Sequence, residues 1–534
     1  MPPLVDSRYL SDYTLEIQAL LFHKWPESRD SIPRTLVDSA AAPPTITEFV
    51  ALALCLDRIW KDMMKVQARR PLSALRRMAV MAAAATVTII APGVANAETP
   101  ANPTGDPSLD WLYGQNSDFA EGGGFGSVSL SAGGNKFRDP FYTPPANLSS
   151  LPNGAIIRQR NVQPIPIIGG VAKQLAYKTL NSKDQPILTV TTLFTPNGCG
   201  GSGSASGSGT GSASGSASGS GGGGDCVGAG KLISYQHATN SLGMKCQPSV
   251  IFGGNNVINS LTVLTPFLQE TLKRGYTVSV PDHNGPLSSF IAGNTEGHSV
   301  LDGIRASENS LGLPTDTEVA LVGQSGGAHA TAWGAQLQPS YAPELNVISA
   351  AMAGPPLDIL ATGRQNNGKN TSYLYFAAVV ALFREYPQET DPNGFFTEHG
   401  KDVVKQFGDA CMLKEGLSPS GFGTQTLQSL TNWPDSDDPI PHWPKAQAIG
   451  ELNQAARPGQ IPKAPMLIVQ GDADGIVPTD STTAMVGKYC AAGATVDYQI
   501  VPGGHVDVSI DHWGQLLDYT ADRFAHKPAP STCK

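Results

Sequence analysis

Glu318-Val319-Ala320-Leu321-Val322-Gly323-Gln324-Ser325-Gly326-Gly327 is the stretch that decides the fold, because three structural signals meet in it. Its first half is a β-run, and an alanine-rich helical stretch follows from Ala328 to Gln336. The G-x-S-x-G between them is the pattern of a nucleophile elbow, in which a strained turn projects a serine hydroxyl at the top of a sheet. In a chain with 58 glycines the pentapeptide alone is weak, but its strand–helix setting predicts that Ser325 is a nucleophile.

A carboxylate candidate follows a later strand. Serine is a poor nucleophile until a base takes its proton, and an acid usually orients that base. The strand expected at Met466–Gln470 runs into Gly471-Asp472-Ala473-Asp474-Gly475-Ile476-Val477-Pro478. We expect Asp474 to be the acid, since its spacing places it in the turn after the strand, where open α/β sheets carry their sites. Asp472 is the reserve candidate, and a simple turn aspartate is the structural alternative.

A histidine candidate follows the next strand. The strand expected at Thr495–Val501 leads through Pro502-Gly503-Gly504 to His505, which gives the chain order Ser–Asp–His of α/β-hydrolases. A loop-exposed imidazole is the alternative, but the order and the matching strand ends favour catalysis. Four other histidines lack this setting and rank lower as bases: His283, His298, His329 and His512.

An oxyanion hole needs backbone donors that are in place before the reaction. The N–H of Gly326, directly after the nucleophile, is the expected first donor. Two loops compete for the second donor, namely His237–Ser241 and Gly253–Asn255.

Alternating strands and helices predict an α/β fold with a mostly parallel central sheet and helices on both faces. We expect its core in residues 136–355 and 462–534, with a mainly helical cap inserted at 356–461. The cap's aromatic residues either present an apolar underside to an acyl chain or form the cap's own core. Further strands are expected at Ala155–Arg158, Gln174–Lys178, Ile187–Phe194, Lys231–Tyr235, Ser249–Phe252, Tyr276–Val280 and Asn346–Ala350, with helices near Leu261–Lys273 and Val506–His526.

Several segments are expected to lie outside this core. Residues 63–97 have the basic, apolar and Ala95-Asn96-Ala97 parts of a signal peptide, so the protein should be secreted after cleavage before Glu98. Residues 1–62 precede that signal. Either they are not translated, because translation starts at Met63 or Met64, or they form a disordered stretch. Residues 98–135 read as a flexible lead-in, and 200–225 as a Gly/Ser-rich surface loop.

The cysteines predict disulfides, and the composition argues against metal and nucleic-acid binding. Removal of the leader discards Cys55 and leaves an even set, typical of disulfides in an exported protein: Cys199, Cys226, Cys246, Cys411, Cys490 and Cys533. No C-x-x-C or His-rich cluster suggests a metal, and we expect no cofactor. The net charge of −9 and the absence of a basic patch argue against nucleic acid as a partner.

Short motifs along residues 137–526 resemble the secretory lipases, a family of capped α/β-hydrolases that includes the fungal lipase A type. They occur in the family's order and include Asp139-Pro140-Phe141-Tyr142, Tyr177-Lys178-Thr179, Ser234-Tyr235-Gln236, Cys246-Gln247-Pro248-Ser249, Pro281-Asp282-His283, Gly297-His298-Ser299-Val300-Leu301-Asp302 and Arg305-Ala306, besides the elbow and the two late turns.

The resemblance implies an exported lipase or esterase with Ser325, Asp474 and His505 as its triad. It favours Asn240 for the second oxyanion donor, although an aspartate is common there in the family. It also favours the pairs Cys246–Cys411 and Cys490–Cys533, which leaves Cys199 with Cys226.

We therefore predict a secreted serine hydrolase that cleaves carboxylic esters, with acylglycerols among its substrates, through an acyl-enzyme. Its partners would be a small-molecule or lipid ester and, transiently, a lipid interface; we make no prediction of its oligomeric state. The alternatives are an acyltransferase or peptidase on the same fold, because fold and triad do not name the bond that is cleaved, or a non-catalytic binding protein.

Overall fold

The computed structural model describes most of the chain from residue 102 onward. The described residues are 102–113, 139–164, 168, 170–196, 228, 230–252, 265–410, 419 and 421–534. All of them belong to one compact unit, Leu75–Lys534. The predicted signal peptide, the residues before it and the loop at 200–225 lie outside the described residues.

A nine-stranded sheet forms the centre of this unit, in the order β1-β2-β3-β5-β4-β6-β7-β8-β9. From β5 through β4 to β9 all neighbouring strands are parallel, whereas β1, β2, β3 and β5 pair antiparallel. The strands span Ile156–Val162, Val171–Leu180, Pro186–Thr195, Leu232–Gln236, Thr277–Pro281, Glu318–Gln324, Asn346–Ala353, Met466–Gly471 and Val496–Val501 in chain order, β1 to β9. The predicted mostly parallel α/β sheet is therefore confirmed.

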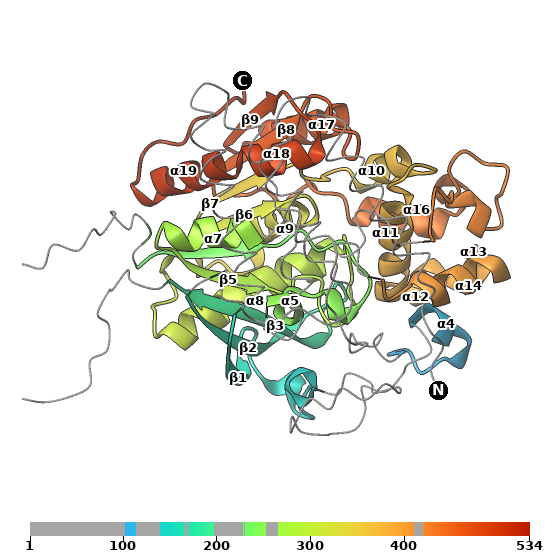
Figure 1. The fold of residues 1–534 in the computed structure, drawn as a ribbon, viewed down its shortest axis with the longest axis horizontal. Helices are drawn as coiled ribbons and strands as arrows, with labels where there is room; N and C mark the ends of the chain where they lie inside the picture. The colour runs from blue at the N-terminus through green and yellow to red at the C-terminus, as the bar shows by residue number, and fades with distance from the viewer. Residues whose placement is uncertain are drawn as a thin grey trace, which may run out of the picture. The chain divides into compact units, whose positions relative to one another are not determined.

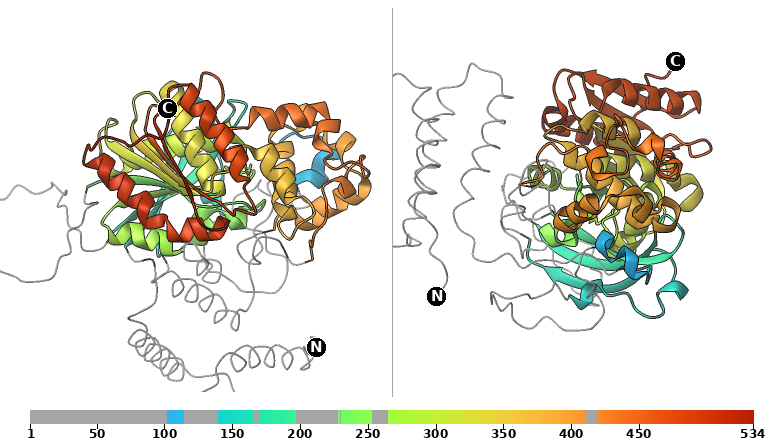
Figure 2. Two further views of the ribbon diagram at one scale, coloured as in Figure 1. Left: turned by 90° about the horizontal axis from the view of Figure 1, so that it is seen from above. Right: turned by 90° about the vertical axis from the view of Figure 1, so that its right-hand side faces the viewer.

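Helices cover both faces of the sheet (Figure 2). Alternate residues of β6 point to opposite sides, as strand geometry requires: Val319 and Leu321 join one apolar cluster, and Ala320 and Val322 the other. The first cluster contains α8, α9 and α17 (Gly293–Leu311, Gly326–Tyr341 and Thr479–Ala491). The second contains α5, α7, α18 and α19 (Pro248–Phe252, Thr265–Lys273, His505–Asp511 and Trp513–Phe524).

The chain between β7 and β8 builds a separate group of helices, which lies beside the sheet at the right of Figure 1. They are α10, α11, α12, α13, α14 and α16 (Ile359–Asn366, Ser372–Glu385, Pro387–Thr390, Pro392–Phe395, Glu398–Phe407 and Pro444–Leu452), with the 3-10 turns η6 and η7 (Gln428–Leu430 and Ile440–His442). Aromatic side chains such as Phe376, Phe383 and Phe395 are buried together there. Most of these aromatic side chains thus form a core of the helical group itself. We call this cluster of buried apolar side chains the cap cluster.

Part of the predicted flexible lead-in is folded against this cap cluster. Asp106 caps the 3-10 turn η2 (Pro107–Leu109), and α4 (Asp110–Tyr113) follows directly. Trp111 packs edge-on against Phe396 with 5.6 Å between ring centroids. The prediction of a flexible lead-in is therefore wrong for these residues, because their few apolar side chains find partners far along the chain. The remaining 3-10 turns are η3, η4 and η5 (Pro140–Tyr142, Leu148–Ser150 and Met244–Cys246).

Two local predictions differ from the structure. The run Ser249–Phe252 is not a strand but belongs to the helix α5, which Pro248 begins; proline suits the first helical position, and short apolar runs are ambiguous. The single helix expected at Val506–His526 is divided at His512 into α18 and α19. Within the described part of the chain, no helix combines the length and apolarity needed to cross a bilayer.

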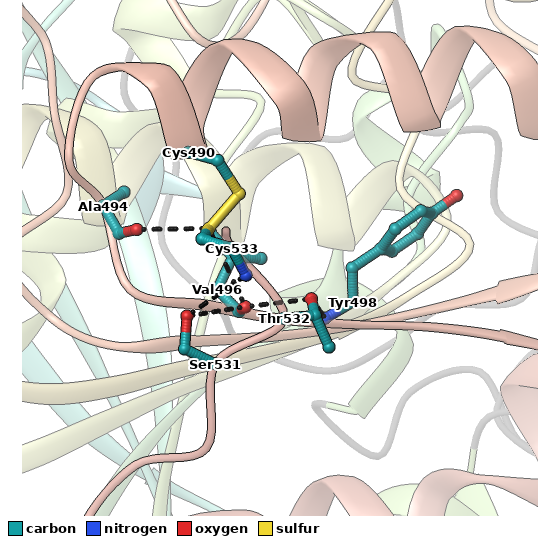
Figure 3. The surroundings of a disulfide bond; sticks show 7 residues. All are labelled: Cys490, Ala494, Val496, Tyr498, Ser531, Thr532 and Cys533. Carbon is teal, nitrogen blue, oxygen red and sulfur yellow. Dashed lines mark hydrogen bonds between the residues drawn. A yellow bond between two sulfur atoms is a disulfide. The ribbon is translucent and has the colours of Figure 1, made fainter.

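A disulfide joins Cys490, at the end of α17, to Cys533 near the C-terminus (Figure 3). It closes a sequence separation of 43 residues and fastens the terminal segment beside β9, where Thr532 N–H donates to the carbonyl of Val496. This predicted pair is confirmed. Cys246 is also disulfide-bonded, but its predicted partner Cys411 lies outside the described residues, as do Cys199 and Cys226.

Candidate active site

Ser325 stands at the turn between β6 and α9. Its φ of 52° places a non-glycine residue in the left-handed region, which costs free energy and is held only when the surroundings enforce it. Its own N–H donates to the carbonyl of Ala353 at the end of the neighbouring strand β7. A Cβ on Gly327 would come within 2.0 Å of the carbonyl oxygen of Gln236, so only glycine lets α9 begin this close to β4. These are the features of a nucleophile elbow.

His505 connects this serine to a carboxylate. Its Nε2 lies 2.7 Å from Oγ of Ser325, and its Nδ1 lies 2.8 Å from Oδ2 of Asp474. Ser325 follows β6, Asp474 follows β8 and His505 follows β9. These strands are parallel, so the three residues lie at the same edge of the sheet. The structure thus brings together the three residues that the sequence singled out, in a continuous hydrogen-bonded chain.

The Asp474 carboxylate receives four hydrogen bonds. Its Oδ1 accepts from the N–H groups of Ile476 and Val477, and its Oδ2 accepts from His505 and from Nε2 of Gln470 at 2.9 Å. Burial alone would raise the pKa of Asp474, but the bonds and charge of His505 and the two backbone N–H groups outweigh burial and hold this pKa below its ordinary value. Asp474 is therefore suited to remain an anion beside His505.

Sequence reasoning missed the part played by Gln470. It is the last residue of the predicted strand and is completely buried. A buried amide at a strand end, four residues before a candidate acid, was the available signal, because buried polar groups need partners.

Gly354 lies directly against the imidazole of His505. Its φ is +57°, and a Cβ at this position would lie 3.0 Å from Cε1 of His505. Its N–H donates to the carbonyl of Val469 in β8. A side chain at residue 354 would therefore strain the backbone and press on the imidazole.

Gly326 and Asn240, the two predicted oxyanion residues, line one cavity with Ser325. Gly326 is the first residue of α9, so its N–H has no carbonyl one turn back in the helix to donate to. The loop that carries Asn240 approaches it closely, since a Cβ on Gly326 would lie 3.0 Å from the Thr239 carbonyl oxygen. The competing loop Gly253–Asn255 lies outside the described residues, and the oxyanion role remains a prediction.

The weaker candidates lie outside the hydrogen-bonded chain of Ser325, His505 and Asp474. Asp472 is exposed, and its Oδ1 accepts from the N–H of Gly503 in the turn before His505. His329 is completely buried, with its Nδ1 2.6 Å from Glu296. His283 and His298 are also buried, and the Nδ1 of His512 bonds to Gln515. In the described part of the chain, no group of three or more His, Cys, Asp or Glu side chains could hold a metal ion.

Comparison with known families places this geometry in context. The model of the secretory lipase family matches residues 259–532, just over half of the chain and including all three residues of the hydrogen-bonded chain. The chain belongs to the secretory lipase family. Membership confirms the predicted family, its α/β-hydrolase fold, its ester-hydrolysing activity and its secreted location.

Named relatives and a solved structure cover most of this secretory lipase. "Secreted triacylglycerol lipase LIP3" of Malassezia restricta is 29% identical over 416 residues, 73% of this chain and 80% of the relative. "Lipase A" of Moesziomyces aphidis is 30% identical over 378 residues, 69% and 75% of the two chains. The crystal structure of Candida antarctica lipase A superposes with a TM-score of 0.63 at 27% identity, covering 74% of this chain and 87% of that one.

One relative carries a different name. A Mycobacterium tuberculosis protein named "probable inactive lipase" is 30% identical over 417 residues, 73% of this chain and 82% of its own. Family likeness therefore extends to a protein that is named as inactive.

The cavity above Ser325 in this secretory lipase is mainly apolar. Phe290, Ile291, Pro356, Ile359 and Val477 contribute to its walls. A second cavity lies among α10, α11 and α16. Both share the lining residues Ile359, Tyr375 and Ala378. Two neighbouring cavities with mostly apolar walls thus lie between the serine and the helical group.

Proposed function

We propose that this secretory lipase cleaves its ester through a triad of Ser325, His505 and Asp474. The supporting observation is the chain of two hydrogen bonds from Ser325 Oγ through His505 to Asp474 at the base of an apolar cavity. With Nδ1–H donating to Asp474, the Nε2 of neutral His505 is free to accept the serine proton.

The reaction takes two steps. Ser325 Oγ attacks the ester carbonyl while His505 Nε2 takes its proton, and a tetrahedral intermediate forms with its oxyanion toward the backbone donors of Gly326 and the Asn240 loop. His505 then gives the proton to the leaving alcohol oxygen, which leaves an acyl-enzyme. Water activated by the same imidazole releases the acid and restores Ser325. Asp474 keeps the imidazole oriented and stabilises its cation throughout.

The substrate we propose is an ester of a fatty acid, with acylglycerols as the natural class. The two adjoining cavities are lined mostly by aliphatic and aromatic side chains, which suit an acyl chain. Residues 356–461 would act as the cap that holds this chain, between core parts 136–355 and 462–534. Contact with a lipid interface is part of this proposal.

Ser325→Ala is the first test. Hydrolysis of a chromogenic ester should fall by roughly 10⁴-fold or more, because the nucleophile acts as a unit with His505. Circular dichroism and thermal unfolding should match the wild type. Incubation of the wild type with a p-nitrophenyl phosphonate should give a stoichiometric adduct on Ser325, seen by mass spectrometry. A non-catalytic protein, like the relative named as inactive, would neither hydrolyse the ester nor take up the phosphonate.

The cap assignment is tested by Ala378→Phe, which places a large side chain where the two cavities share their wall. We expect kcat/KM for a long-chain ester to fall about tenfold relative to a short-chain ester, because the acyl chain loses apolar contact. Ala448→Phe is the matched control, since Ala448 is an exposed residue of α16. An unchanged ratio of long-chain to short-chain activity in Ala378→Phe would contradict the assignment. Assays with and without a lipid interface test the interfacial contact.

A further inference from the structure

Two consecutive buried charges, Arg384 and Glu385, end the helix α11. Arg384 is 1% exposed, and its guanidinium donates to three backbone carbonyls. Nε donates to Leu112 in α4 at 2.8 Å, Nη1 to Leu242 at 3.0 Å, and Nη2 to Gly408 after α14 at 2.8 Å. The three acceptors belong to segments far apart in the sequence, so one side chain joins them.

A guanidinium in this place is costly. Burial lowers the pKa of Arg384 to about 10, even though Tyr113, Tyr373 and Asp409 oppose that change. Its hydrogen-bond partners within the described ranges include no carboxylate. The compensation for burial therefore comes from the carbonyls, and the planar fork of donors in arginine suits three acceptors in different directions.

The Leu242 carbonyl belongs to the loop that carries the predicted oxyanion residue Asn240. Two contacts of this loop lie on either side of Asn240 in the sequence. Asn284 Nδ2 donates to the Thr239 carbonyl, which also lies against Gly326, and Arg384 holds the carbonyl of Leu242. The side chain of Leu242 is completely buried in the cap cluster. Asn240 lies between these two contacts in the sequence, and one of them comes from α11.

Glu385 binds a second segment that reaches the cavity above Ser325. Its carboxylate accepts from Ser182 N–H, Ser289 Oγ and Thr295 Oγ1 at 2.6–2.8 Å. Ser289 directly precedes Phe290, which lines the cavity beside Gly326. The two neighbouring charges thus join α11 to two segments that line the cavity, the Asn240 loop and the segment of Phe290.

We propose that Arg384 is a positioning residue for the oxyanion hole, holding the Asn240 loop in register with Gly326 through the carbonyl of Leu242. This inference rests on the proposed function, because it gives Asn240 an oxyanion donor to position. The cap then contributes to the chemical step itself and not only to binding of the acyl chain. Loss of the contact should lower kcat, since a displaced donor stabilises the transition state poorly while the substrate still binds.

Arg384→Met tests this inference, because methionine fills similar space without donors. For a p-nitrophenyl ester with a short acyl chain, which needs little of the cap cavity, we expect kcat to fall at least tenfold with KM changed less than about threefold. Near-UV circular dichroism and thermal unfolding establish the folded state at the assay temperature. Arg384→Lys keeps the charge but has a single nitrogen for three separated carbonyls. Its kcat should lie between those of the wild type and of Arg384→Met.

Tyr113→Phe is the matched control. Tyr113 Oη donates to the backbone carbonyl of Arg384 at 2.9 Å, so its loss loosens the same junction without touching Leu242. Its kcat should stay within about twofold of the wild type. A wild-type kcat in every folded Arg384 variant would overturn the inference, and so would an equal loss of kcat in Tyr113→Phe. If Arg384→Met does not fold, Arg384→Lys decides.

Ser325→Ala, measured in parallel, separates this inference from the proposed function. If Ser325→Ala retains activity, the triad proposal fails. If activity depends on Ser325 but not on Arg384, only the positioning role fails.

Discussion

The two sides of the site are built in different ways. The side with Ser325, Asp474 and His505 comes from turns that directly follow three parallel strands, so the strand order alone brings these residues together. The Asn240 loop also follows a parallel strand, β4, but the carbonyl of its Leu242 is bound by Arg384 of α11, which lies 142 residues from Leu242 and 272 from Leu112. The proposed reacting groups thus depend on turns at strand ends, whereas the Asn240 loop and the helices beside the cavity also depend on contacts between distant segments.

Asp474→Asn should produce the largest change and tests the strand-end side. An amide would favour the wrong imidazole tautomer, so we expect kcat to fall by about 10³–10⁴-fold with the fold intact. Asp472→Asn, two residues earlier in the same turn, should stay within about threefold of the wild type. Steady-state kinetics on one ester decide between them, and the reverse ranking would make Asp472 the acid.

Gln470→Met should have a smaller effect on the same side. It removes the donor to Asp474 Oδ2 while keeping a buried side chain of similar length. A hydrogen bond to a charged group contributes about 1.5–3 kcal/mol, so we expect a loss of roughly tenfold in kcat/KM. The acid limb of the pH profile should move to higher pH, because a carboxylate with fewer donors attracts the imidazolium more strongly.

Gln336→Met is the matched control for Gln470→Met. Gln336 is a buried glutamine of α9 whose Oε1 accepts from the Tyr489 hydroxyl, away from the triad. Its pH profile should keep the wild-type shape. A profile that moves equally in both variants would assign the effect to packing and not to the carboxylate.

These differences explain how far the sequence could predict the structure. Ser325, Asp474 and His505 were predictable because a G-x-S-x-G turn and two glycine-rich turns stand at strand ends, where a parallel sheet gathers its loops. The antiparallel pairing of β1–β3 had no comparable signal, and the short apolar run before Phe252 suited a strand as well as a helix.

Arg384 gave no such signal. An arginine near the end of a helix usually reads as a solvated charge, and only the fold brings the carbonyls of Leu112, Leu242 and Gly408 around it. The same holds for α4, whose few residues have no apolar periodicity of their own and become ordered through Trp111 and Tyr113. The position of a side chain that depends on several distant segments cannot be predicted from the sequence of one segment alone.

Two buried glutamates, Glu385 in α11 and Glu308 in α8, show what hydrogen bonds to a buried carboxylate contribute to stability. Glu385 has three donors, whereas both carboxylate oxygens of Glu308 are buried without a hydrogen-bond partner among the described residues. Burial raises the pKa of Glu308 to about 8, assisted by Glu344 and Asp316 and opposed by Arg305. The folded protein therefore holds this proton more tightly than the unfolded chain, and Glu308 lowers stability progressively as pH rises from its ordinary pKa toward 8.

Glu308→Gln should accordingly raise the Tm by about 2 °C at pH 9 and leave it unchanged near pH 4. Glu385→Gln should lower the Tm at both pH values, because one amide cannot accept from all three donors. Thermal unfolding of the three proteins across this pH range measures both effects. A Tm of Glu308→Gln below that of the wild type at pH 9 would show that the carboxylate has a stabilising partner.

The short helix α4 has a consequence for how the chain tolerates cleavage on its N-terminal side. Arg384 Nε donates to the carbonyl of Leu112, and Tyr113 donates back to the carbonyl of Arg384. A protease that cut after Tyr113 and released these residues would leave the sheet and the triad untouched but would remove one of three acceptors from a buried cation. A cut of this kind should therefore lower the stability of the helices around Arg384 more than that of the sheet, because Arg384 lies more than 270 positions downstream of the residues that the cut removes.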